Sequence, residues 1–188
     1  MNSLKTIAMT GFMGSGKSAV GRNLADRLQV PFRDLDSLIE LGERKVIADI
    51  FKDRGEAYFR KLEREYFDKA VSQPPLILAL GGGAIQQPEI ADYLRKYTVT
   101  VYLEVPLNTL FERLQKSRHR PLLHGPDGMP LNDEQLMQRI SSLLSERRPL
   151  YRCADITLSV QHDWTCDKTT DELMRLLEKH ASTTITED

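Results

Sequence analysis

Residues 11–18 read GFMGSGKS and satisfy the pattern G-x-x-x-x-G-K-[ST] in full. An apolar run, Thr6–Thr10, precedes this stretch, and an amphipathic segment, Lys17–Leu28, follows it. Glycines in such a loop let successive backbone N–H groups turn toward an anion that sits between strand and helix. The stretch therefore predicts a phosphate-binding loop in an α/β domain, in preference to a glycine-rich turn that only links strand to helix.

The lysine and serine that end this motif suit a nucleoside triphosphate and its metal ion. Lys17 would bring a positive charge to the β- and γ-phosphates, and the Ser18 hydroxyl would bind Mg²⁺. The helix that starts here would direct the positive end of its dipole at the same anion. The residues expected to contact ATP from this segment are Gly14, Ser15, Gly16, Lys17, Ser18 and Ala19. The motif does not decide between a kinase, a switch and a motor.

Outward from the motif, short apolar runs alternate with segments of helical period, which is typical of a parallel sheet covered on both faces. Strands are expected at Thr6–Thr10, Pro31–Asp34, Leu76–Leu80, Thr98–Leu103 and Asp155–Ser159. Helices are expected at Lys17–Leu28, Ser37–Gly42, Val46–Asp53, Glu56–Val71, Pro88–Lys96, Pro106–Gln115, Asp133–Arg147 and Asp167–His180. No internal repeat or second domain stands out, so residues 1–188 are predicted to form a single α/β domain.

Composition narrows the class of protein. The 188 residues include 26 Lys and Arg against 27 Asp and Glu, and 40% of them are hydrophobic, as in an ordinary globular domain. The net charge of −1 argues against a nucleic-acid partner but not against a small anionic ligand. Cys153 and Cys166 are too few for a disulfide framework. Without a signal peptide, membrane span or heptad seam, we expect a cytoplasmic monomer with no membrane partner.

Two segments interrupt the alternation of strands and helices. Residues 117–131 read SRHRPLLHGPDGMPL, and their prolines and glycines exclude a helix or a central strand. Such a long connection is either a functional lid or disordered. Its basic residues are opposed by a single acid, Asp127, and this local positive charge favours a mobile lid that closes on an anionic ligand. The basic residues are Arg118, His119, Arg120 and His124. The small polar residues 182–188 are expected to fray.

Two carboxylates lie two residues apart where the second predicted strand ends. Residues i and i+2 of a strand share one face, and the carboxyl edge of a parallel sheet holds the ligand crevice. One of the two carboxylates, Asp34 and Asp36, is therefore predicted to assist Mg²⁺, and the other to reach an acceptor hydroxyl. The alternative, that Asp36 only caps the next helix, leaves Asp34 unexplained.

Three glycines and two arginines mark further candidates. Gly81, Gly82 and Gly83 end the third predicted strand, where they form either a ligand-approaching backbone or a flexible turn. Arg60 has Glu63 at i+3 to hold its guanidinium, whose planar fork suits a carboxylate, although such pairs are more often surface features. Arg147 continues an apolar stripe and is expected to face inward. That stripe consists of Leu136, Ile140 and Leu143.

Taken together, six stretches resemble the shikimate kinase family in content and order. They are GFMGSGKS at 11–18, DLD at 34–36, FRKLE at 59–63, LGGGA at 80–84, RPLL at 120–123 and ERRPLY at 146–151. The resemblance covers the chain from about residue 6 to residue 158. It implies a P-loop NTPase fold like that of the nucleoside monophosphate kinases, with a five-stranded parallel sheet, flanking helices and a lid. It also implies transfer of the γ-phosphate of ATP to the 3-hydroxyl of shikimate, with Mg²⁺ as cofactor, on the route to chorismate and the aromatic amino acids.

Carried over to this chain, the resemblance assigns roles to individual residues. The shikimate carboxylate falls to Arg60 and Arg147, its hydroxyls to Asp36 and its ring to the backbone around Gly82. Arg148 leaves a one-residue ambiguity, in which helical phase favours Arg147. The resulting substrate set is Asp36, Arg60, Gly81, Gly82, Gly83 and Arg147.

For the nucleotide, the resemblance places Arg120 on the ATP phosphates after lid closure, Arg113 beside the adenine and Asp34 in the Mg²⁺ shell with Ser18. The catalytic residues are then Lys17, Asp36 and Arg120. Two rival interpretations remain. One is another small-metabolite kinase of the same fold, acting on gluconate or a nucleoside monophosphate. The other is a binding module in which ATP controls partner affinity without phosphorylating an acceptor.

Overall fold

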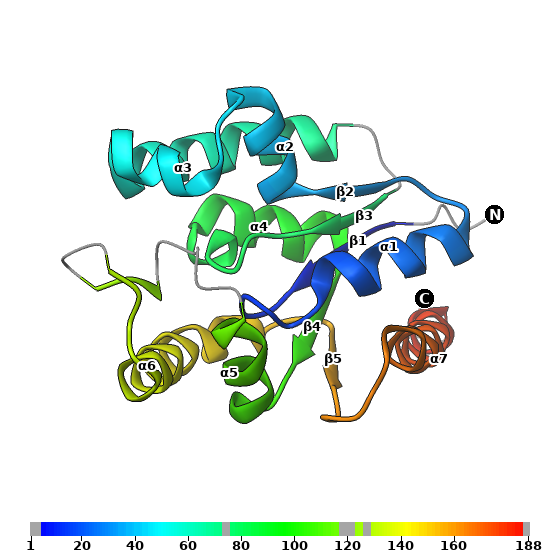
Figure 1. Cartoon of the computed structure of the whole chain (residues 1–188). Coiled ribbons are helices and arrows are strands. Elements are labelled where there is room, and N and C mark those ends of the chain that lie inside the picture. Colours follow the sequence, from blue (N-terminus) through cyan, green and yellow to red (C-terminus); the bar gives the residue numbers. More distant parts are fainter. Residues whose placement is uncertain (1–4, 73–75, 117–122, 126–128, 186–188) are drawn as a thin grey trace.

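The computed structural model describes residues 5–72, 76–116, 123–125 and 129–185 (Figure 1). Its centre is a parallel sheet of five strands in the order β2-β3-β1-β4-β5. The strands are β1 (Thr6–Thr10), β2 (Phe32–Asp34), β3 (Ile77–Ala79), β4 (Thr98–Glu104) and β5 (Ile156–Ser159). The predicted strands are confirmed, and each strand begins and ends within one residue of its predicted limits.

Helices cover both faces of this sheet (Figure 1). They are α1 (Lys17–Leu28), α2 (Leu35–Glu43), α3 (Ile47–Val71), α4 (Pro88–Tyr97), α5 (Leu107–Gln115), α6 (Asp133–Tyr151) and α7 (Cys166–Ile185), with a 3₁₀ turn η1 (Ala84–Gln86). Within the described residues, no helix combines the length and apolar character that crossing a membrane requires.

The central strand β1 divides the core into two layers. Ile7 and Met9 belong to a cluster with buried residues of α1, α5, α6 and α7, whereas Ala8 belongs to a second cluster with α2, α3 and α4. Successive strand side chains point to opposite faces, so a strand covered on both sides is buried throughout, as β1 is. The loop that follows β1 is therefore anchored in the middle of the fold.

Two helix predictions differ from the structure in instructive ways. The two helices predicted around residues 46–71 form one element, α3, but the predicted break is confirmed by Gly55, where φ is 78°. The helix predicted to end at Arg147, before Pro149, instead continues to Tyr151. A proline inside a helix costs one backbone hydrogen bond. The helix nevertheless continues past Pro149, and its last residue, Tyr151, is 1% exposed.

The end of the chain and the predicted lid are only partly open to comparison. Helix α7 continues to Ile185, past residue 182, where we expected the chain to fray. Of the predicted lid, residues 117–122 and 126–128, including Arg120, lie outside the described residues. In the part described, His124 pairs with Pro130 as an isolated antiparallel bridge, and Leu123 is buried. The lid's movement therefore stays a prediction.

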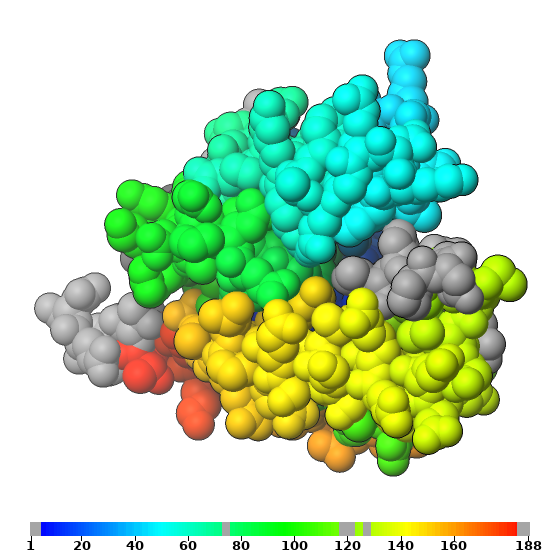
Figure 2. All heavy atoms as spheres, turned by 90° about the vertical axis from the view of Figure 1, so that its left-hand side faces the viewer, coloured from blue at the N-terminus to red at the C-terminus, as the bar shows by residue number. Residues whose placement is uncertain are grey.

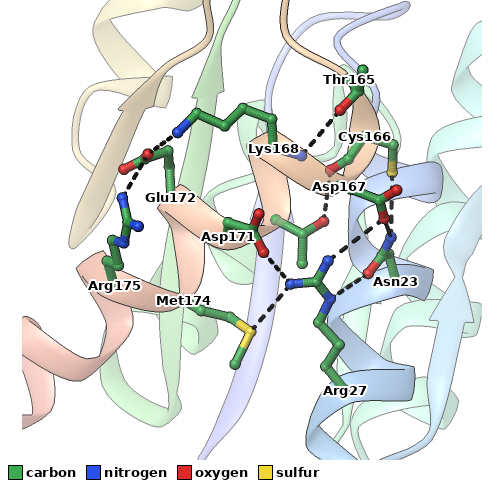
Figure 3. Close-up of polar contacts among 11 residues, drawn as sticks. Asn23, Arg27, Thr165, Cys166, Asp167, Lys168, Asp171, Glu172, Met174 and Arg175 are labelled. Atoms are coloured by element: carbon green, nitrogen blue, oxygen red, sulfur yellow. Dashed lines mark hydrogen bonds and ion pairs between the residues drawn. The ribbon is translucent and has the colours of Figure 1, made fainter.

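A polar cluster fastens α7, which carries no motif, to α1 (Figure 3). Arg27 donates to Asp171 and lies 3.5 Å from the Asp167 carboxylate. Asn23 donates to Asp167 at 2.7 Å and accepts from Arg27 at 2.8 Å. We call Asn23, Arg27, Asp167 and Asp171 the α1–α7 cluster. Trp164 packs against the apolar core beside it, as a local packing anchor.

Candidate active site

A cavity of about 640 Å³ lies at the carboxyl end of the sheet, beside the phosphate-binding loop. Its lining comes from that loop, from α2 and α3, from the glycines after β3 and from α6. Figure 2 shows the groove between the α3 segment above and the α6 segment below. The charged and hydroxyl side chains that line the cavity include Ser18, Asp34, Asp36, Arg60, Glu63 and Arg147. The structure thus gathers predicted phosphate, metal and acceptor residues around one space.

The loop 11–18 has the backbone that its glycines predict. Gly14 and Gly16 have φ of 78° and 98°, a region that residues with a Cβ rarely adopt. Lys17, only 9% exposed, donates from Nζ to the carbonyl oxygens of Gly11 and Phe12 at 3.0 Å each. The lysine charge is therefore held at the mouth of the loop, where a bound phosphate would meet it.

Ser15 is a buried residue of this loop. Its Oγ is buried and has no hydrogen-bond partner within the described residues. The fit of the loop to ATP rests on its other groups: Gly14 and Gly16 give it the backbone that turns N–H groups toward a phosphate, and Lys17 Nζ is held beside them.

Asp34 and Asp36 both reach the cavity, but not in the predicted way. Strand β2 ends at Asp34, which caps α2 by accepting from the Ser37 N–H at 3.1 Å. Asp36 lies in the first turn of α2, so the predicted shared strand face is wrong. The alternative that Asp36 caps the helix is also wrong, because Asp34 holds that position. A helix start, rather than a strand edge, brings both carboxylates to the cavity.

Ser18 and Asp34 fit a magnesium ion. The Ser18 hydroxyl donates to Asp34 Oδ2, which places two oxygen ligands side by side next to the phosphate loop. Across the described ranges, no group of three or more His, Cys, Asp or Glu forms a metal cage. Mg²⁺ commonly binds through one or two protein oxygens together with substrate phosphates and water, so this sparse donor set suits it.

At the other side of the cavity, a carboxylate holds Arg60, as predicted. Arg60 Nη1 donates to Glu63 Oε2 at 2.7 Å, and Nη2 donates to Glu56 Oε1 at 2.9 Å. The Glu63 side chain is 1% exposed and also accepts from Gln87 at 2.8 Å. Burial raises the pKa of the Glu63 carboxyl and outweighs the opposing charge of Arg60. The sequence predicted the pair, but not the burial of its acid.

Charged side chains pack closely on Gly81 and Gly83, two of the three glycines after β3. A Cβ on Gly81 would lie 2.7 Å from both Asp36 Oδ1 and Glu63 Oε1. A Cβ on Gly83 would lie 2.7 Å from both terminal nitrogens of Arg60. Real Cβ atoms do not approach polar atoms so closely, which favours a built wall of the cavity over a flexible turn.

Arg147 faces inward, as its helical phase predicts. Arg147 is 4% exposed, and its Nη1 donates to the Gly82 carbonyl at 3.3 Å. Arg148 instead points to Glu104, with 3.7 Å between Nε and Oε1, and does not line the cavity. The buried stripe before Arg147 includes Leu144 in place of the predicted Leu143. We call Arg60, Glu63 and Arg147 the acceptor cluster.

The remaining predicted residues divide between described and undescribed parts of the chain. Arg113 Nη1 donates to the Gly14 carbonyl at 3.1 Å, so this guanidinium lies against the phosphate loop. Arg120 lies outside the described residues. Sequence reasoning missed Tyr151, whose hydroxyl donates to the Gly82 carbonyl. The run ERRPLY contains this tyrosine, but a bond to a distant backbone oxygen leaves no signal in the sequence.

Comparisons with known proteins place the chain in a family. The family model for shikimate kinase matches residues 13–178. This chain belongs to the shikimate kinase family. The shikimate kinase of Chlorobium chlorochromatii is 40% identical over 177 residues, which cover 94% of this chain and 93% of that relative.

Solved structures support the same membership. A shikimate kinase from Acinetobacter baumannii, determined in complex with shikimate, has a TM-score of 0.84 and 32% identity, and the match covers 96% of this chain and 94% of that one. A gluconokinase from Sinorhizobium meliloti has a TM-score of 0.63 at 18% identity, which shows a shared fold alone. The predicted fold, a P-loop kinase with a five-stranded parallel sheet, is confirmed.

Proposed function

We propose that this member of the shikimate kinase family transfers the γ-phosphate of ATP to the 3-hydroxyl of shikimate. The product is shikimate 3-phosphate, on the route to chorismate and the aromatic amino acids. One observation carries the proposal: a single cavity joins the phosphate-binding loop to two inward arginines on separate helices. Phosphate donor and anionic acceptor would therefore meet in one space.

The acceptor side of the cavity suits a carboxylated ring. Arg60 and Arg147 offer planar guanidiniums, which bind both oxygens of a carboxylate. Ile47, Phe51 and Phe59 give the cavity an apolar wall. Such a wall suits the carbon face of a ring better than an open-chain polyol such as gluconate, which carries a hydroxyl on every inner carbon.

Catalysis would then rest on positioning and on charge neutralisation. Lys17 would stabilise the negative charge of the transferring phosphoryl group, and the family resemblance adds Arg120 on the same phosphates. Asp36 would orient the acceptor hydroxyl and receive its proton. Mg²⁺, bound through Ser18 and Asp34, would supply further positive charge to the phosphate oxygens.

We also propose that the enzyme works as a cytoplasmic monomer without a nucleic-acid or membrane partner. The near-neutral net charge of −1 supports the lack of a nucleic-acid partner. Cys153 and Cys166 are both exposed free thiols, which suits a reducing compartment.

A coupled ADP-release assay with shikimate, with gluconate and without acceptor tests the proposed function. We expect ADP release that depends on shikimate, because only the acceptor completes the site and water is a competing nucleophile. Turnover with gluconate alone would indicate the rival small-metabolite kinase. Acceptor-independent turnover, or none at all, would favour the binding module.

A further inference from the structure

The Gly82 carbonyl is held by two donors from one helix. Arg147 and Tyr151 are one turn apart on α6, and both donate to this oxygen, Arg147 from Nη1 at 3.3 Å. The Tyr151 ring stacks on Tyr102 of β4, with 5.2 Å between ring centroids and 25° between ring planes. Tyr151 is thus fixed between the sheet and the glycine segment that lines the cavity.

The Tyr151 hydroxyl is suited to act as a permanent donor. Burial raises the pKa of this phenol, so the hydroxyl keeps its proton throughout the physiological range. A phenylalanine would fill the same space and keep the stacking. The two side chains would differ only in the hydroxyl and its bond to the Gly82 carbonyl.

We propose that Tyr151 is a positioning residue for the acceptor carboxylate, an inference that rests on the proposed function. Tyr151 holds the Gly82 carbonyl in place, and this carbonyl is the group to which Arg147 Nη1 also donates. Arg147 Nε is buried and has no hydrogen-bond partner within the described residues, and the bond from Nη1 to this carbonyl helps to orient the guanidinium. The C=O and N–H of a trans peptide point in opposite directions, so the same bond also sets the peptide that joins Gly82 to Gly83.

The test compares Tyr151→Phe with Tyr102→Phe. Both variants remove one phenolic hydroxyl from the same stacked pair, but the hydroxyl of Tyr102 neighbours Arg148 rather than Gly82. KM for shikimate, KM for ATP and kcat are measured for both, and calorimetry measures shikimate binding directly. Thermal unfolding of each variant checks that the fold is retained.

We expect Tyr151→Phe to raise KM for shikimate about tenfold, the loss typical of one buried hydrogen bond, while kcat and KM for ATP change less than about twofold. Tyr102→Phe should leave all three constants near those of the wild type. Unchanged shikimate binding in Tyr151→Phe, an equal change for ATP, or the same change in Tyr102→Phe would overturn the inference. Shikimate binding without turnover in the wild-type enzyme would instead contradict the proposed function.

Discussion

The acceptor cluster and the α1–α7 cluster are both built from arginines and carboxylates. The first is proposed to bind a ligand, whereas the second joins two helices. In the acceptor cluster, Glu63, whose side chain is 1% exposed, pairs with Arg60, whereas Arg147 donates to the Gly82 carbonyl. In the α1–α7 cluster, one guanidinium faces Asp167 and Asp171, whose side chains are 76% and 49% exposed (Figure 3).

This difference in burial and in charge balance separates the proposed binding site from a structural contact between two helices. Arg147 directs a nitrogen at a neutral carbonyl, so its charge is left for an anionic ligand. Arg27 is matched by carboxylates in water, where ion pairs add little to stability and attract no ligand. Counting arginine–carboxylate pairs would have ranked the two clusters alike, whereas their surroundings distinguish them.

The largest effect is expected at Lys17, a buried cation outside both clusters. Lys17→Ala should lower kcat by roughly two to three orders of magnitude, because it removes a preorganised charge from the transferring phosphoryl group. Lys168→Ala, which removes an exposed lysine paired with Glu172 on α7, is the matched control and should retain wild-type kinetics. Steady-state kinetics with both substrates measure the difference, and near-wild-type turnover of Lys17→Ala would refute its role.

The next effect contrasts the two clusters directly. Arg60→Ala should weaken shikimate binding by about 2–5 kcal/mol and leave ATP binding nearly unchanged, because it removes a carboxylate partner and leaves Glu63 buried without its cation. Arg27→Ala should change neither constant. Substrate titrations of both variants give the answer. An equal loss for shikimate and ATP in Arg60→Ala would mean that Arg60 is structural.

The smallest effect is on the pH dependence of unfolding. The change of stability with pH should have opposite signs for the acids of the two clusters. Burial raises the pKa of Glu63 above its unfolded value of 4.5. Above that pH the unfolded chain releases this proton first, so the stability contributed by Glu63 falls as pH rises toward its folded pKa. The hydrogen bond from Arg27 lowers the pKa of Asp171, so its contribution is present above 3.8 and is lost as pH falls.

Urea unfolding of Glu63→Gln and Asp171→Asn across the acid range tests these signs. The difference in unfolding free energy between wild type and variant should decrease with rising pH for Glu63→Gln and increase for Asp171→Asn. Slopes of the same sign would show that burial does not separate the clusters.

Local sequence predicted the features that depend on local chemistry. The phosphate loop, the five strands and the break at Gly55 were predicted correctly because glycine pattern and apolar period specify them. The inward phase of Arg147 followed from the stripe on its own helix. These features need no knowledge of distant contacts.

Features that depend on tertiary contacts could not be predicted. Asp36 lies on a helix because the side chain of Asp34, the last residue of β2, caps α2, which begins at Leu35. Helix α6 continues past Pro149 to Tyr151, whose contacts with Gly82 and Tyr102 are tertiary and leave no local signal. Glu63 looks like a surface acid in sequence, since only the packing of the glycine segment against α3 buries it.

The most direct test of the acceptor site compares shikimate with its methyl ester in the ADP-release assay, in the wild-type enzyme and in Arg60→Ala. The ester keeps the ring and hydroxyls but lacks the charge that Arg60 and Arg147 are proposed to bind. We predict that the wild-type kcat/KM falls steeply for the ester, and that Arg60→Ala discriminates much less between the two acceptors. Equal kcat/KM for shikimate and its ester in the wild-type enzyme would contradict the proposed recognition of the acceptor.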